Sequence, residues 1–352
     1  MHNFLQLLFL LVFFSACNRD SSAEGEWVIT VSGSLPEPVS NQAVSEGFVG
    51  EVPFLYSFGG IDSTKLFSGI HLRSYKLNVL TGEAERIQNL PDTLGKIASA
   101  ASRINDTIYI IGGYHVFEDG SEKSSDRVHR YLISENRFME DGAPIPIPID
   151  DQVQMIYKNR YIYVITGWSD KENIPAVQIY DAEEDRWIQG TAVPDNHDFK
   201  SFGASGSLIG NTVYYLGGAS MGKNFPIQAV LRKGRIHPNN PAQIEWTEEK
   251  LKEDYVGYRM ASFERKGKLY WVGGSNNTYN YNGIAYDGSG GVEPNGRLLI
   301  YDELGFQQEF FKKIPMDLRG IANIDDSVKY VVGGITGEQK TSQEIIKLEW
   351  ID

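Results

Sequence analysis

The amino-acid sequence predicts an all-β chain that folds as a closed ring of six similar four-stranded sheets. Two observations predict this ring: a doublet of small residues recurs at intervals of 51 to 60 residues, and a short apolar strand precedes each doublet. A repeat of this length indicates one supersecondary unit copied several times, because each copy buries its apolar faces only against its neighbours. The doublets are Gly59-Gly60, Gly112-Gly113, Thr166-Gly167, Gly217-Gly218, Gly273-Gly274 and Gly333-Gly334.

The strand before each doublet is rich in β-branched and aromatic residues and almost continuously apolar, which is typical of strands buried on both faces. A tight polar turn such as Asn105-Asp106 lies just upstream of most of these strands, and another strand-like run lies before the turn. Each pair of runs therefore predicts a β-hairpin. The second strands of the hairpins are expected at Val52–Phe58, Thr107–Ile111, Tyr161–Ile165, Thr212–Leu216, Lys268–Val272 and Val328–Val332.

Downstream of the doublet comes a third strand marked by a tyrosine, and an aromatic residue seven positions later marks a fourth. Tyr180 with Trp187, and Tyr131 with Phe138, show this spacing. Six units of four strands account for nearly the whole chain after its leader. In these features the chain resembles the kelch family of β-propellers, and the resemblance implies an all-β, six-bladed kelch-type β-propeller.

The last unit is one strand short. After its doublet the chain offers only Glu344–Trp350, whereas Trp27–Val31 near the other end has the composition of an outer strand. Pairing of the N- and C-terminal strands would close the ring and remove an exposed sheet edge. We therefore expect a single propeller domain over residues 26–352.

The N-terminus has a different character. The apolar run Phe4–Phe14 is too short to span a bilayer, and Ser15 and Ala16 precede Cys17, the one cysteine of the chain. This resembles a bacterial lipoprotein signal, which implies a signal peptide over residues 1–16, a lipidated tether over 17–25 and a place in the cell envelope, at the bacterial outer membrane. An ordinary cleaved signal peptide and a cytosolic chain remain the alternatives.

The net charge of −13, from 33 basic and 46 acidic residues, argues against nucleic-acid binding, because contacts between cations and phosphates supply most of that affinity. We expect a glycan or an envelope protein as partner, and contact with the membrane only through the lipid anchor. Ligands should meet the face of the ring that carries the long loops, since loops on a rigid scaffold commonly carry function. The longest of these loops spans residues 274–296.

Cationic side chains are expected at the mouth of the central channel. Counting fourteen residues back from each doublet aligns Ser45, Ala98, Gln152, Gly203, Arg259 and Arg319, with Lys96 and Lys200 close by. Such a cluster would suit a carboxylate or a sulfate, which arginine can bind through two hydrogen bonds. Packing within the repeat is the other interpretation of these arginines.

Aromatic and amide side chains provide further candidate ligand contacts. Asn277, Tyr279 and Tyr281 lie in the longest loop and offer the donors, acceptors and flat rings that suit a sugar, although such a loop can also simply pack on itself. His115, Trp168 and Tyr258 are expected on the same face.

Two kelch-type relatives of this fold are enzymes, and their sites can be compared with this sequence. The copper site of galactose oxidases requires a cysteine joined to a tyrosine, and Cys17 belongs to the expected export signal, so we expect no copper oxidase. We also expect no metal and no cofactor. Resemblance in size and blade number to sialic-acid mutarotases implies that Arg259 and Arg319 bind an anionic sugar, with Asp151 or Glu46 as the carboxylate that moves protons. The glutamate of that family has no counterpart in Gly217–Met221.

Two hypotheses follow. The favoured one is an envelope-anchored binding module for a glycan or a partner protein, and the alternative is a mutarotase or epimerase acting on an anionic sugar such as sialic acid.

Overall fold

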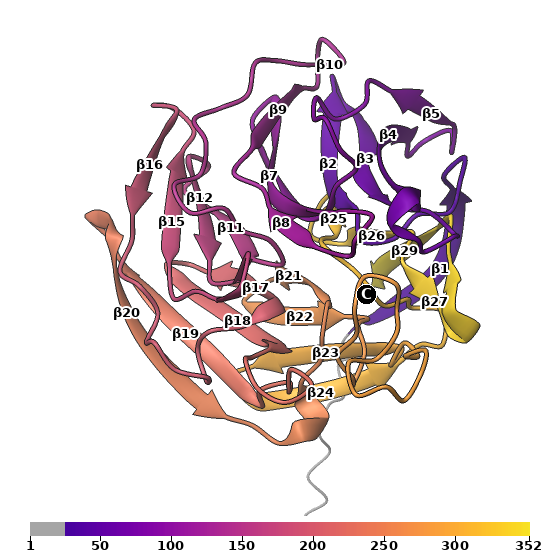
Figure 1. Ribbon diagram of the computed structural model, residues 1–352. Coiled ribbons are helices and arrows are strands. Elements are labelled where there is room, and N and C mark those ends of the chain that lie inside the picture. Colours follow the sequence, from indigo (N-terminus) through magenta and orange to yellow (C-terminus); the bar gives the residue numbers. More distant parts are fainter. Residues whose placement is uncertain (1–24) are drawn as a thin grey trace, which may run out of the picture.

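The computed structural model describes residues 25–352. In this part of the chain six antiparallel sheets are arranged around one axis (Figure 1), each with a path of four strands, and in the second sheet the short strand Glu122–Ser124 pairs as a fifth. The predicted six-bladed β-propeller is thereby confirmed. Cys17 and the expected signal peptide lie outside the described residues. From Gly25 onward, no helix has the length and apolarity needed to cross a membrane.

Each blade runs from its innermost to its outermost strand in chain order, except where the ring closes. The first three blades are formed by β2 (Ala43–Val49), β3 (Val52–Ile61), β4 (Ile70–Asn78) and β5 (Ala84–Ile87); by β6 (Ile97–Ile104), β7 (Thr107–Val116), β9 (Val128–Leu132) and β10 (Arg137–Phe138); and by β11 (Val153–Tyr157), β12 (Tyr161–Ile165), β15 (Val177–Asp181) and β16 (Arg186–Gln189). The last three are formed by β17 (Phe202–Ile209), β18 (Thr212–Ala219), β19 (Val230–His237) and β20 (Asn240–Lys250); by β21 (Ala261–Arg265), β22 (Lys268–Val272), β23 (Arg297–Asp302) and β24 (Gly305–Phe310); and by β25 (Ala322–Asn323), β26 (Val328–Val332), β29 (Glu344–Ile351) and β1 (Glu26–Ser34). Short elements in the loops are β8 (Glu122–Ser124), β13 (Trp168–Ser169), β14 (Glu172–Asn173), β27 (Ile335–Thr336), β28 (Lys340–Thr341) and the 3₁₀ helices η1 (Phe67–Gly69), η2 (Glu253–Tyr255) and η3 (Gly337–Gln339).

The two ends of the chain close the ring as predicted. Strand β1 pairs antiparallel with β29, with Trp27 opposite Trp350, and Figure 1 shows the indigo and yellow strands side by side. The Trp27 ring also packs edge-on against Phe263 and Tyr270 of the fifth blade, at centroid distances of 5.3 and 5.6 Å. The pairing of β1 with β29 therefore completes the sixth blade, and it buries the Trp27 ring against the fifth blade.

The small-residue doublets mark the places where neighbouring blades meet. The first residue of every doublet has a left-handed backbone, with φ between 44° and 71°. At Gly217, a Cβ atom would lie 2.1 Å from the carbonyl oxygen of Gly257 in the loop before the fifth blade. Glycine satisfies both requirements, since it tolerates positive φ and leaves room for the neighbouring backbone. An apolar cluster fills the space between each pair of adjacent blades.

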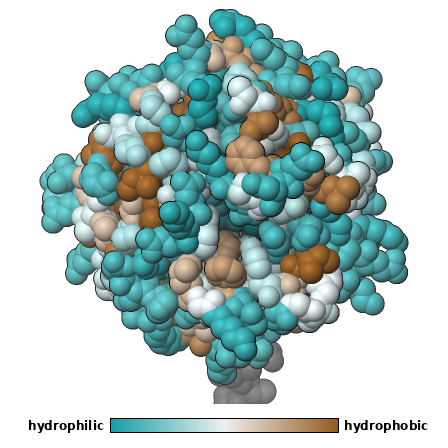
Figure 2. Space-filling view, in the orientation of Figure 1, coloured by the Kyte–Doolittle hydropathy of each residue, from teal (hydrophilic) through white to brown (hydrophobic). Residues whose placement is uncertain are grey.

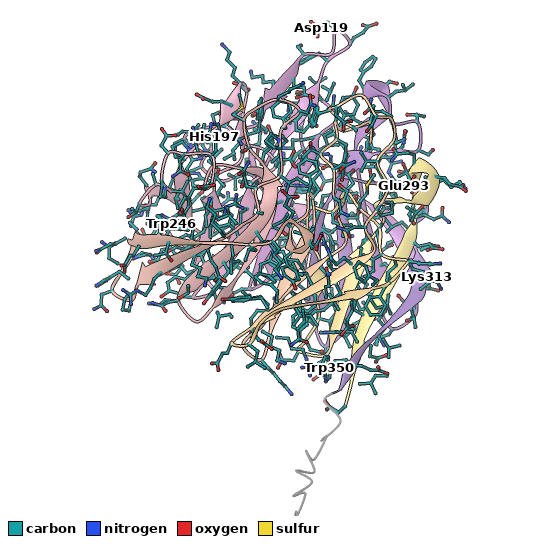
Figure 3. The ribbon with its side chains drawn as sticks, turned by 90° about the horizontal axis from the view of Figure 1, so that it is seen from below. Asp119, His197, Trp246, Glu293, Lys313 and Trp350 are labelled. Carbon is teal, nitrogen blue, oxygen red and sulfur yellow. The ribbon has the colours of Figure 1, made fainter. Side chains whose placement is uncertain are left out.

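The two faces of the ring differ. The loops that leave the second strand of each blade and those that enter the next blade lie on one face, here called the loop face. Figure 3 shows Asp119, in the turn between β7 and β8, and Trp350, near the end of β29, at opposite ends of the axis. The face seen in Figure 2 is mostly hydrophilic, with small separate apolar patches.

Candidate functional site

A ring of left-handed residues surrounds the axis where the loop face meets the innermost strands. These residues are Asn41, Ala98, Asp151, Gly203, Arg259 and Asp317, with φ between 49° and 66°. Backbone hydrogen bonds link these residues around the axis. In five of the six steps the N–H of one ring residue donates to the carbonyl oxygen of the preceding ring residue, at 2.8–3.3 Å. In the step from Arg259 to Asp317, the N–H of the next residue, Leu318, donates to the carbonyl oxygen of Arg259 at 3.0 Å. The chain thus brings one residue from each of the six repeats to the mouth of the channel.

The predicted alignment of the channel mouth is correct in three blades. Ala98, Gly203 and Arg259 lie in the ring, whereas Asn41, Asp151 and Asp317 replace the expected Ser45, Gln152 and Arg319. The spacing of fourteen residues fails in these three blades because the chain between the ring residue and the doublet is longer there.

Arg259 lies at the centre of a buried ionic cluster. Its guanidinium donates to both carboxylate oxygens of Asp151, at 2.7 and 3.2 Å, and to Oδ1 of Asp317 at 3.1 Å. Arg319 contacts Asp151 Oδ1 at 2.6 Å, and all four side chains are at most 3% exposed. Burial of an unpaired charge is very costly, so the carboxylates of the protein itself neutralise these arginines. The expectation that Arg259 and Arg319 offer free cations to a ligand is therefore wrong.

A pocket of about 130 Å³ opens on the loop face beside this cluster, and we call it the loop-face pocket. Loops of the second to fifth blades contribute its walls. Its aromatic lining consists of Tyr114, Trp168, Phe202, Phe225 and Tyr286. Its polar lining consists of Glu122, Asp150, Asp151, Arg259 and Asn280. Aromatic and polar side chains thus line one pocket, which suits the end of a small polar molecule.

Trp168 is held in place by backbone and aromatic contacts. Its N–H and carbonyl pair with those of Asp150 at 2.9 Å each. Its ring packs edge-on against Phe202 at 5.4 Å and Phe225 at 5.8 Å, and Phe225 packs in turn against Tyr286 at 4.8 Å. Trp168, Phe225 and Tyr286 are only partly buried. The pocket therefore presents fixed aromatic surfaces to a ligand.

The two adjacent aspartates of the pocket have opposite electrostatic surroundings. Burial, followed by the charge of Asp151, raises the pKa of Asp150 well above its usual value, and Asp150 accepts a hydrogen bond from Ser124 Oγ at 2.6 Å. Burial alone would also raise the pKa of Asp151, but Arg259 and Arg319 outweigh it and lower that pKa. Asp150 thus keeps its proton to a higher pH than Asp151 does.

Two predicted ligand residues lie in a separate buried cluster. Lys96 Nζ is 3.0 Å from Asp92 and 2.8 Å from His129 Nε2, and burial lowers the pKa of Lys96 despite the neighbouring Asp92. His115 Nδ1 contacts the carbonyl oxygen of Gly95 at 2.9 Å, next to the same cluster. Neither Lys96 nor His115 lines the loop-face pocket.

Two further candidates are placed elsewhere. Lys200 forms an ion pair with Asp195 at 2.6 Å. Glu46 lines the opposite mouth of the channel, where it contacts Arg103 at 3.1 Å and accepts a hydrogen bond from the N–H of Asn323 at 3.1 Å. The candidate carboxylates Asp151 and Glu46 therefore do not face a common pocket.

The three predicted tyrosines do not line the loop-face pocket. Tyr258 and Tyr279 are fully buried, and the guanidinium of Arg259 lies 5.0 and 5.3 Å from their ring centroids. Tyr281 packs against an apolar cluster near β6 and β7, and Asn277 is exposed in a neighbouring groove. Of the predicted ligand residues, Trp168 and Arg259 line the pocket.

Sequence reasoning missed Glu122, Phe202 and Phe225 as lining residues. A signal for part of the site lies in the repeat, because the residue just before the ring residue is Asp150 in the third blade, Phe202 in the fourth and Tyr258 in the fifth. Asp150 and Phe202 line the pocket and Tyr258 packs on Phe202 at 5.7 Å.

Comparison with known proteins supports the kelch assignment. No model of a protein family matches the sequence. Kelch-like protein 15 of Danio rerio is 24% identical over 177 residues, which cover 49% of this chain and 28% of that protein. The Homo sapiens protein is 24% identical over 179 residues with the same coverage, and the Gallus gallus protein is 26% identical over 115 residues, covering 33% of this chain and 22% of its own. The matches thus cover less than a third of these relatives.

A solved structure, that of YjhT, superposes with a TM-score of 0.72 at 12% identity and covers 92% of this chain and 100% of its own. At this identity the likeness shows the fold alone. Taken with the six blades and the glycine doublets, these matches show that the protein is a kelch-type six-bladed β-propeller.

Proposed function

We propose that the protein is a binding module that holds the terminal residue of a neutral glycan in the loop-face pocket. The observation that carries the proposal is the combination of partly exposed aromatic rings, Trp168, Phe225 and Tyr286, with the carboxyl group of Asp150. Aromatic faces stack on the apolar faces of a sugar ring, and a carboxyl group can accept and donate hydrogen bonds to its hydroxyls.

The charges around the pocket favour a neutral ligand over an anionic one. Arg259 and Arg319 are already paired with Asp151 and Asp317. Burial raises the pKa of Glu122 at the pocket even though Arg259 opposes the shift, so the surroundings already disfavour negative charge there. An additional carboxylate from a sugar acid would meet these acidic side chains without a free cation.

Lipidation of Cys17 and a place at the cell envelope are also part of the proposal. Glu26 pairs with Ile351 and Ser34 pairs with Glu344, so the chain enters β1 at the face opposite the loops. A lipid on Cys17 would therefore leave the loop face directed away from the membrane. Radiolabelled palmitate should label the wild-type protein in membranes, whereas C17S should remain unlabelled and soluble; labelling of C17S would contradict the anchor.

A glycan array followed by isothermal titration calorimetry tests the binding function. Trp168→Ala should weaken the binding of an array-positive sugar about 30-fold, the equivalent of about 2 kcal/mol for one buried aromatic contact. Phe310→Ala is a matched control, because Phe310 is an exposed aromatic residue on the outer strand β24. Equal affinity of Trp168→Ala and the wild type would overturn the assignment of the site.

A second candidate function is sugar mutarotation, favoured by the contrast between Asp150 and Asp151. Neighbouring carboxyl groups whose pKa values are driven apart often divide acid and base roles. Asp150 would donate a proton to the ring oxygen, and Asp151, whose lowered pKa keeps it ionised beside Arg259 and Arg319, would take the proton of the anomeric hydroxyl. NMR of a freshly dissolved aldose at micromolar protein tests this activity. Unchanged anomer exchange would exclude it while leaving the binding function intact.

A further inference from the structure

A larger groove lies next to the loop-face pocket. It has a volume of about 350 Å³ and is lined by side chains of the loops between β18 and β19, between β20 and β21, and between β22 and β23. We call it the amide groove, because Asn224, Asn276 and Asn277 contribute to its lining. Among the residues assigned to function so far, only Asn277 lines it, and the loop-face pocket has none of its lining residues in common.

The pocket and the groove are lined by adjacent residues of the same two loops. Phe225 lines the loop-face pocket, whereas its neighbours Asn224 and Pro226 line the amide groove. Tyr286 likewise lines the pocket and Asp287 lines the groove. A molecule that left the pocket across the Phe225 and Tyr286 rings would therefore enter the groove.

These two loops are held together by contacts between their residues. Thr278 Oγ1 donates a hydrogen bond to the carbonyl oxygen of Asn224 at 2.9 Å, and the Phe225 and Tyr286 rings pack at 4.8 Å. Asn224 and Phe225 both have left-handed backbones, with φ of 61° and 52°. For a bulky residue such as phenylalanine this conformation is a true outlier, and such strain is concentrated at ligand sites. Phe225 lines the loop-face pocket, while the residues on either side of it line the amide groove.

The groove has the chemistry of a sugar-hydroxyl site. Within residues 25–352, the side-chain amides of Asn224 and Asn277 have no hydrogen-bond partner, so both can donate to and accept from a ligand. Asn276 uses its oxygen to accept from Arg297 at 3.2 Å. The charged residues Lys223, Glu253 and Asp287 are of mixed sign, which gives no strong preference for a charged ligand.

We propose that the site binds an oligosaccharide of at least two residues, whose terminal residue occupies the loop-face pocket and whose following residues cross the Phe225 and Tyr286 rings into the amide groove. This inference rests on the proposed glycan-binding function and adds the length and course of the ligand. Aromatic rings next to polar side chains suit a chain of sugar rings, because successive sugar rings present both apolar faces and hydroxyl edges.

Calorimetric titration with neutral sugars of increasing length tests the inference. The probes are the cello-, malto-, manno-, xylo- and chito-oligosaccharides from two to four residues, each compared with its own monosaccharide. For the series that binds, the tetrasaccharide should bind at least about tenfold more tightly than the monosaccharide, the gain expected from one or two added hydrogen bonds. Equal affinity at all lengths would overturn the inference but keep the proposed function.

Variants separate the two spaces. Asn277→Ala combined with Lys223→Ala should reduce tetrasaccharide affinity to that of the monosaccharide and leave monosaccharide affinity unchanged. Asn239→Ala is the matched control, since Asn239 is an exposed asparagine in the outer turn between β19 and β20. A double variant that keeps the full tetrasaccharide affinity would overturn the inference. Absence of binding by every sugar tested, or binding only of peptides on a parallel peptide array, would reject both proposals.

Discussion

Removal of the Arg259 guanidinium should destabilise the propeller more than removal of almost any surface charge. In Arg259→Met, Asp151 keeps its 2.6 Å contact with Arg319. Asp317, however, loses the cation that contacts it and stays buried. Its remaining hydrogen-bond partners are Ser40 Oγ at 2.9 Å and Tyr279 OH at 3.3 Å. Breaking a buried ion pair in this one-sided way costs about 3–5 kcal/mol. Urea unfolding followed by tryptophan fluorescence measures the loss, and Arg137→Met, which removes an exposed charge, should change stability by less than about 0.5 kcal/mol.

The pH dependence of the same variant tests the cause of the loss. Burial already raises the pKa of Asp317 although Arg259 opposes the shift, so without Arg259 the pKa should rise further. A raised pKa in the folded state means that protonation restores stability, so the deficit of Arg259→Met should shrink as the pH falls from 8 to 5. Adding Asp317→Asn should recover part of the deficit at pH 8. A loss below about 1 kcal/mol, or a loss that is independent of pH and of Asp317, would show that Arg259 does not stabilise the fold by neutralising Asp317.

Three further predictions concern the pairing of the two terminal strands, stability at acid pH, and the ring of left-handed residues at the channel mouth. Trp27→Ala should cost about 3–5 kcal/mol in urea unfolding, because it empties an aromatic cavity between the first and last strands and the fifth blade; a loss below about 1 kcal/mol would argue against the closure contact. Burial, followed by the charge of Arg73, lowers the pKa of His71 to about 4. The free energy of unfolding should therefore fall by about 3 kcal/mol as the pH falls from about 6.5 to 4. His71→Gln should abolish this loss, and a loss that persists in the variant would contradict the assignment to His71. Gly203→Ala should lower the midpoint of thermal unfolding, because Gly203 has a φ of +66° and an added Cβ atom would lie 2.3 Å from the Tyr258 side chain. An unchanged midpoint would show that the Tyr258 side chain can move aside.

The fold could be predicted from the sequence because its main determinants are local and repeated. Each glycine doublet is required where one blade touches the backbone of the next, as Gly217 does at Gly257, so the repeat appears directly in the sequence. The pairing of Trp27 with Trp350 could also be predicted, because the last unit lacks a strand and the first residues of the domain supply one of matching composition. Periodicity and strand count therefore carried enough information to define the architecture.

The site was predicted less well because it depends on contacts between distant residues. The sequence indicates that Arg259 lies at the channel mouth, but not that Asp151, 108 residues away, neutralises it. A spacing of fourteen residues before the doublet predicts that Arg319 is the ring residue of the sixth blade. The ring residue there is Asp317, and Arg319 contacts Asp151 from two residues further along the chain. Phe225 lies in the pocket because of an unusual backbone conformation that no composition rule predicts. Trp168 was predicted, because it directly follows a doublet on the loop face.

A crystal structure of the protein with an array-positive sugar would locate the glycan site. We expect sugar density in the loop-face pocket, with one ring against Trp168 and hydroxyl groups within hydrogen-bond distance of Asp150. Density at the opposite mouth of the channel, beside Glu46 and Arg103, with an empty loop-face pocket, would contradict this expectation.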